Sequence, residues 1–154
     1  MQRELDEILA QVPFFAGMQA DEIALIAGCG SNVHVAEGET IFRQGDAADA
    51  FYVIRHGTVA VGNFVPPRGE LVIETLESGD LLGWSWLFPP YRSHFDARAL
   101  SAVRATQFDG ACLRDKCAAD PVLGYDLMSR FAQVLIERLQ WTRLRLLDVY
   151  GNGR

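Results

Sequence analysis

The sequence lacks a long apolar run. No stretch approaches the roughly 18 consecutive apolar residues that a membrane span needs. The N-terminus, Met1-Gln2-Arg3-Glu4, also lacks the basic segment followed by an apolar segment that marks a signal peptide. We therefore expect a cytoplasmic protein.

Cysteine is scarce, and Cys29, Cys112 and Cys117 are odd in number and scattered. This pattern is typical of reduced cytosolic thiols. Cys112 and Cys117 could share one helical face as half of a metal site, but no neighbouring residues complete four ligands. We expect ordinary small, buried side chains and no metal.

An excess of basic residues is also missing. The 154 residues include 14 Lys and Arg against 20 Asp and Glu, for a net charge of −6, which argues against free nucleic acid as a partner of the whole surface. There is no Gly-rich phosphate loop. Ser93, His94 and Asp96 lie too close in sequence to face one another as a catalytic triad. We do not expect an enzyme.

What the chain does have is enough apolar sequence, 49% of its residues, for one domain, which we divide into three regions. Residues 1–30 predict two short helices, over 3–11 and 23–27, with Asp21 as the N-cap of the second. Residues 33–109 alternate short β-branched and aromatic runs with Gly-centred turns, which is typical of an antiparallel barrel or jelly roll. Residues 110–150 predict C-terminal helices. The expected fold is mostly β, a double-stranded β-helix barrel with flanking helices.

The last helix is the longest. Asp120 and Pro121 predict its start as N-cap and first residue, and no Gly or Pro interrupts the chain from Tyr125 to Tyr150. A helix over 121–149 would be about 44 Å long, more than a small barrel can cover.

One side of this helix carries a heptad seam with alternating spacings of four and three residues, which predicts a parallel homodimer. The seam consists of Met128, Ala132, Leu135, Leu139, Thr142, Leu146 and Val149. The alternative is a helix that lies on its own barrel, which Leu127, Phe131 and Val134 would allow for the first half. The second half is also apolar at Trp141, Leu144 and Leu147, which favours the dimer.

Several motifs, in this order and spacing, resemble the cyclic nucleotide-binding domain of the catabolite activator (Crp/Fnr) family. They are residues 12–18 (VPFFAGM), 37–46 (EGETIFRQGD), 51–57 (FYVIRHG), 138–142 (RLQWT) and 147–149 (LDV). The resemblance covers nearly the whole chain and implies the family's barrel, its ligand cassette, here residues 79–99, and its dimer helix.

The same resemblance sets the register of the cassette. Residues 97–100 (ARAL) match the family's Val-x-Ala-Leu, which places Leu82-Gly83-Trp84 on the family's Phe-Gly-Glu and Ser93 on its phosphate-binding Arg. Trp84 cannot accept a hydrogen bond from a ribose hydroxyl as Glu does, and Ser93 carries no charge. We therefore predict no tight binding of cyclic AMP or cyclic GMP.

Other charged residues leave a second interpretation open. Arg92 lies one residue before the expected position, and a slip by one residue would restore a cation. Asp96 stands where the family has a neutral residue, and it would repel a phosphate if it faced inward. From the helix, Thr142 matches the position that touches the purine, and Arg143 could supply a cation.

The candidate pocket comprises Leu82, Gly83, Trp84, Ser85, Arg92, Ser93, His94, Thr142 and Arg143. Its aromatic neighbours either plug the old site or form walls for a different flat or apolar ligand, with Arg92 and His94 as polar handles. These aromatics are Trp84, Trp86, Phe88, Tyr91 and Phe95. Some relatives bind haem through histidine, but a lone histidine such as His94 is more often structural. We assign no cofactor.

The leading hypothesis is a stand-alone homodimeric sensor with a degenerate cassette. The sequence ends at Arg154, where transcription factors of the family continue into a helix-turn-helix module, so we expect a protein partner and no direct binding of DNA. One alternative is a genuine cyclic nucleotide-binding regulator with Arg92 on the phosphate. The other is a structural dimerisation module without a ligand.

Overall fold

The computed structural model describes residues 2–63 and 71–152 and, within them, the side chains of 5–63 and 71–148. The chain divides into two compact units, Met1–Lys116 and Cys117–Arg154. Each unit is described by itself below.

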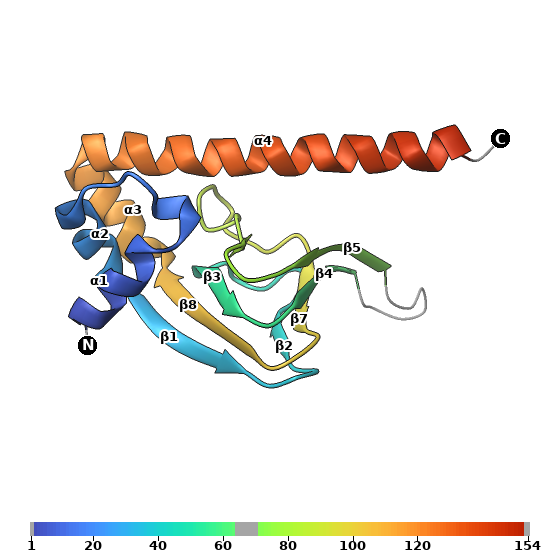
Figure 1. Ribbon diagram of the computed structural model, residues 1–154, viewed down its shortest axis with the longest axis horizontal. Coiled ribbons are helices and arrows are strands. Elements are labelled where there is room, and N and C mark those ends of the chain that lie inside the picture. Colours follow the sequence, from blue (N-terminus) through green and yellow to red (C-terminus); the bar gives the residue numbers. More distant parts are fainter. Residues whose placement is uncertain (1, 64–70, 153–154) are drawn as a thin grey trace. The chain divides into compact units, whose positions relative to one another are not determined.

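The first unit is built on two antiparallel four-stranded sheets, as expected from the short alternating runs. One sheet has the order β1 (Gly30–Val35), β8 (Val103–Asp109), β3 (Ala50–His56), β6 (Leu81–Leu82). The other has the order β2 (Thr40–Phe42), β7 (Asp96–Ala99), β4 (Val59–Asn63), β5 (Leu71–Leu76). Figure 1 shows β1 and β8 running side by side, and β7 next to β2. The predicted mostly-β jelly-roll class is therefore confirmed.

A continuous apolar cluster joins the inward faces of the two sheets. Because side chains alternate along a strand, β3 sends Ile54 to this cluster, with Tyr52 packed against it, while Phe51 faces the other way. The buried members of the cluster are Ile54, Val59, Val61, Leu76, Leu82, Ala97, Ala99, Val103 and Ala105. We call this set the inner cluster.

The N-terminal helices form as predicted, with one difference at a boundary. Helix α1 spans Gln2–Ala10, a 3₁₀ turn spans Pro13–Phe15, and α2 spans Ala20–Ala27. The N-cap of α2 is Gln19, whose N–H donates to the Glu22 carboxylate at 3.4 Å, so the assignment of Asp21 as N-cap was wrong. Both acids lie in the first turn, where negative charge is favourable. Figure 1 shows α1 and α2 side by side.

Cys29 and Cys112 form a disulfide with their Cα atoms 5.7 Å apart, which corrects the expectation of reduced thiols. The register of β1 with β8 explains the pairing, since it places Gly30 opposite Phe108 and joins the Asp109 N–H to the Cys29 carbonyl at 2.9 Å. Helix α3 (Gly110–Ala119) begins directly after β8, which brings Cys112 to Cys29.

The second unit contains α4 (Pro121–Asn152). The predicted N-cap is confirmed, because the Leu123 N–H donates to Asp120 Oδ1 at 3.2 Å. Leu123, Leu127 and Phe131 are buried on one face of the first turns. Every described side chain from Trp141 onward is exposed.

Candidate functional site

Within the cassette, residues 79–99, the irregular part begins where β6 ends, at Gly83. Gly83 has φ +96°, a left-handed conformation that residues with a Cβ rarely adopt. A Cβ there would also lie 3.3 Å from the Ala50 carbonyl oxygen on β3. Glycine is thus required for the chain to turn sharply away from the inner cluster.

The segment between Gly83 and β7 contains no helix. Two tight turns shape it, closed by the Leu87 N–H on the Trp84 carbonyl at 3.2 Å and the Tyr91 N–H on the Phe88 carbonyl at 3.0 Å. A helix N-terminus would offer several parallel N–H groups to an anion. Here two of the N–H groups are already used by the turns.

Trp86 is the buried anchor of the cassette, with 1% of its surface exposed. Its ring stacks on Phe51 at 5.3 Å, and Phe51 stacks on Phe108 at 4.6 Å. Because Phe51 faces away from the inner cluster, Trp86 packs on the opposite face of β3 from that cluster. Trp86 therefore does not plug the barrel.

Arg114 of α3 holds the cassette from the helix side. Its guanidinium donates to the Trp86 carbonyl and lies over the Tyr91 ring, 4.4 Å from the centroid. Phe88 and Phe95 are 69% and 43% exposed, so they fill no interior either. The five aromatics do not act as one plug, because Trp86 is buried on the outer face of β3 whereas Phe88 and Phe95 are exposed.

Ser93, which the sequence predicts to stand in for the family's phosphate-binding Arg, is buried and engaged through its backbone. Its N–H donates to the Asp46 carbonyl at 2.9 Å, and its carbonyl accepts from the Gly45 N–H at 2.8 Å. Arg92 forms a β-bridge with Ala47. The Arg92 side chain is exposed, and its Nη1 lies 3.4 Å from the Gly45 carbonyl oxygen, at the outer rim of the turn.

Asp96 is a buried carboxylate with a structural partner. Only 4% of it is exposed, and its Oδ1 accepts from the Gln44 N–H at 2.7 Å. On β7, Ala97 and Ala99 belong to the inner cluster, so Asp96 faces away from it by alternation. Asp96 fastens the turn before Asp46 to β7 and sends no charge inward.

The remaining predicted pocket residues are dispersed. Leu82 belongs to the inner cluster, Ser85 is half-buried, and His94 is exposed. Thr142 and Arg143 lie exposed on α4 in the second unit, where Thr142 Oγ1 donates to the Arg138 carbonyl at 2.9 Å.

Tyr52 is a residue that the sequence reasoning missed. It packs against the inner cluster and stacks on Phe42, with ring centroids 6.5 Å apart. Burial, and then the charge of Asp49, raise the pKa of its phenol, so it stays a neutral hydroxyl beside the cluster. The alternation Phe51-Tyr52-Val53-Ile54 was the available signal.

The described residues form neither a metal site nor a membrane-spanning helix. Among the described residues, no three His, Cys, Asp or Glu side chains gather as a metal site. Cys112 is in the disulfide, and burial, followed by the charge of Asp120, raises the pKa of the Cys117 thiol. Within that same part of the chain, no helix has the length and apolarity to cross a bilayer.

Comparison with known families decides the relationship. Residues 32–120 match the family described as cyclic nucleotide-binding domain, a span that includes the whole cassette and both sheets except the first two residues of β1. The chain belongs to the cyclic nucleotide-binding domain family.

Its relatives include regulators and solved structures. The CRP-like cAMP-activated global transcriptional regulator of Mycobacterium tuberculosis is 30% identical over 145 residues, which are 94% of this chain and 63% of that protein. A candidate cyclic nucleotide-binding protein from Geobacter metallireducens superposes with a TM-score of 0.78 at 27% identity, covering 87% of this chain and 97% of that one. A cyclic nucleotide-binding domain from Methylobacillus flagellatus shares the fold, with a TM-score of 0.79 at 20% identity over 96% of this chain and 83% of that one.

The chain thus spans less than two thirds of the mycobacterial regulator and is related to Crp-like regulators through the cyclic nucleotide-binding domain.

Proposed function

We propose that this chain is a homodimeric sensor domain whose degenerate cassette does not hold cyclic AMP or cyclic GMP tightly. Its output passes through α4 to a protein partner. A net charge of −6 makes a protein a better match for its surface than free nucleic acid.

The observation that carries this proposal is the state of Ser93 and its neighbours. Ser93 brings no charge to the phosphate position, and its backbone is already paired with the turn at Gly45 and Asp46. The nearest arginine, Arg92, lies at the rim of that turn with its guanidinium exposed. A cyclic phosphate would find neither a cation nor the N-terminus of a helix at this point of the chain.

The expected loss of affinity is large. Each charge-assisted hydrogen bond contributes about 1.5–3 kcal/mol. The proposed alignment removes two of them, because Ser93 replaces the family's Arg and Trp84 replaces its Glu. The combined loss is roughly 3–6 kcal/mol, or about 10²- to 10⁴-fold in Kd.

Isothermal titration with cyclic AMP and cyclic GMP tests the proposal. We expect no saturable heat at micromolar ligand for the natural chain, and a gain of affinity in a Trp84→Glu/Ser93→Arg variant that restores the family's pair. Micromolar or tighter binding by the natural chain would overturn the proposal.

A second candidate function is a true cyclic nucleotide-binding regulator with Arg92 on the phosphate. It is favoured by the mycobacterial relative, a regulator that is named as cAMP-activated. The 3.4 Å separation of Arg92 Nη1 from the Gly45 oxygen is also a weak contact that the side chain can leave at little cost.

Arginine variants separate the two candidates. If the natural chain binds cyclic AMP, Arg92→Ala should abolish binding under the second candidate. Arg43→Ala is the matched control, because Arg43 is an exposed arginine on the same turn. Equal weakening by both variants would argue against a specific role of Arg92.

The dimer part of the proposal is supported by the apolar surface of α4. The described seam residues Ala132, Leu135, Leu139, Thr142 and Leu146 are exposed, and Met128 is half-buried. The side chain of Val149 lies outside the described residues. The exposed fractions of Trp141, Leu144 and Leu147 are 68%, 52% and 67%. Apolar surface of this extent is typical of a protein interface.

Native mass spectrometry of freshly purified protein reports the dimer and any retained small molecule together. Leu139→Glu places a charge in the seam, so we expect the dimer to dissociate into monomers. Gln140→Glu adds the same charge one residue away from the seam and should leave the dimer intact. A natural chain that is monomeric at tens of micromolar would contradict the proposed dimer. A dimer that carries no ligand in vitro or in cells would favour the alternative of a structural dimerisation module.

A further inference from the structure

A separate cavity of about 780 Å³ opens on the first sheet, away from the cassette. It is lined by residues of β1, β3 and β8 and of the turns beside them, namely His34, Val35, Ala36, Glu39, Arg55, His56, Ala102, Val103 and Arg104. Its volume lies within the range of about 300–1,000 Å³ that is usual for sites of small molecules. We call it the basic cavity.

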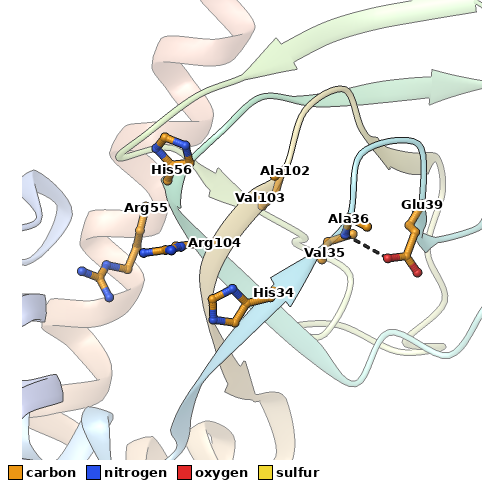
Figure 2. A pocket seen from close by; sticks show the side chains of 9 residues that line it. All are labelled: His34, Val35, Ala36, Glu39, Arg55, His56, Ala102, Val103 and Arg104. Carbon is orange, nitrogen blue, oxygen red and sulfur yellow. Dashed lines mark hydrogen bonds between the residues drawn. The ribbon is translucent and has the colours of Figure 1, made fainter.

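The strand register gathers four basic side chains in the basic cavity. Arg104 on β8 lies opposite His34 of β1 on one side and His56 of β3 on the other. Figure 2 shows the side chain of Arg104 between the two imidazoles and that of Arg55 beside it. The neighbours of Arg104 on β8, Val103 and Ala105, belong to the inner cluster, so the basic groups face outward.

A β-bulge accounts for the fourth basic group. The register of β3 against β8 shifts between Ile54 and His56, so Arg55 has no partner of its own on β8. Consecutive residues on a regular strand face opposite sides, whereas a bulge redirects one of them. Arg55 and His56 can therefore both line the cavity.

No acid neutralises this group within the part of the chain that the structure describes. The carboxylate of Glu39 accepts from the Ala36 N–H at 2.9 Å and lies apart from the basic side chains in Figure 2. Neither Arg55 nor Arg104 has an ion pair with a described carboxylate. Like charges on neighbouring strands are destabilising. The clustering of these basic side chains on β1, β3 and β8 therefore does not contribute to the stability of the fold.

We propose that the basic cavity binds a phosphorylated small molecule, with Arg55 and Arg104 as the main phosphate ligands. Guanidinium groups present paired N–H donors that match phosphate oxygens, and two of them suit a ligand with more than one phosphate. The imidazoles of His34 and His56 add further donors. The size and the concave shape of the site favour a small molecule over the flat surface of an acidic protein.

Tripolyphosphate is the probe for this site, titrated by calorimetry into the full chain at about 150 mM salt, where exposed charges are largely screened. We expect saturable binding, weakened about tenfold or more by Arg104→Gln and by Arg55→Gln. Arg43→Gln removes the same charge from an exposed turn outside the cavity and should change Kd less than twofold. Thermal melting of each variant verifies that it is folded.

The proposal would be overturned by the absence of binding at millimolar tripolyphosphate or by equal weakening by Arg43→Gln. Tighter binding of hexaglutamate would also overturn it, because it would indicate an acidic protein surface as the ligand. Arg92→Ala separates this site from the cassette, because it should leave tripolyphosphate binding unchanged. Loss of binding in that variant would place the anion at the cassette and not in the basic cavity.

Discussion

Removing the disulfide should cost the protein a large part of its stability. The bond joins Cys29 to Cys112, 83 residues apart in sequence, and so closes most of the first unit into one loop. Loop-closure entropy for this separation predicts a contribution of about 4.5 kcal/mol at room temperature. For a chain of this size, that corresponds to a fall in Tm of roughly 10–20 °C.

Urea unfolding of the oxidised protein, the reduced protein and a Cys112→Ser variant measures this contribution. A Cys29→Ser/Cys112→Ser double variant should lose the same free energy as the single variant, because both lack one and the same bond. Cys117→Ser is the control, since Cys117 is the free thiol. Thiol titration of the unreduced, unfolded chain should count Cys117 alone, and after reduction it should count all three cysteines.

The reasoning would be refuted if the oxidised and reduced proteins unfolded within about 1 kcal/mol of each other. It would also be refuted if Cys112→Ser and a Cys29→Ser single variant lost free energies of unfolding that add in the double variant. Additive losses would mean that each side chain matters through its own packing and not through the shared bond.

Two smaller predictions concern single groups. Asp96→Ala should lower the free energy of unfolding by about 1–3 kcal/mol, because it leaves the Gln44 N–H without its acceptor, while Asp115→Ala on an exposed helix position should change it by no more than about 0.5 kcal/mol. Similar losses in both variants would remove the special role of Asp96. The raised pKa of Cys117 keeps its thiol protonated, so iodoacetamide at pH 8 should alkylate it more slowly than in the unfolded chain. Asp120→Asn keeps an N-cap but removes the neighbouring charge, so it should speed alkylation of Cys117. An unchanged rate would contradict the contribution of the Asp120 charge to the raised pKa.

The sequence predicted the sheets well because half-buried strands carry a visible alternation. The same logic missed β6, since Leu81 and Leu82 are too few for any period to appear. It also missed the disulfide and the basic cavity. Both arise from the register of β8 with β1 and β3, which joins residues that are far apart in the chain.

The cassette shows the same limit at the level of side chains. The sequence predicted neither the left-handed turn at Gly83 nor the burial of Ser93. It grouped Trp86 with Phe88 as parts either of one plug or of the walls of one pocket, although Trp86 is buried and Phe88 is exposed. The direction of each side chain in an irregular loop depends on the turns of the loop. Neither the two-residue period of a strand nor the 3.6-residue period of a helix predicts it there.

Helix α3 is attached at two places, and its attachments have a mechanical consequence. The cystine fixes its first turn to the connection between α2 and β1, while Arg114 contacts the cassette through the Trp86 carbonyl and the Tyr91 ring. A ligand that changes the conformation of the cassette must either break the contacts of Arg114 with Trp86 and Tyr91 or move α3 together with the cassette. Because the start of α3 is tethered, the displacement would emerge at its far end, where Asp120 alone separates it from α4.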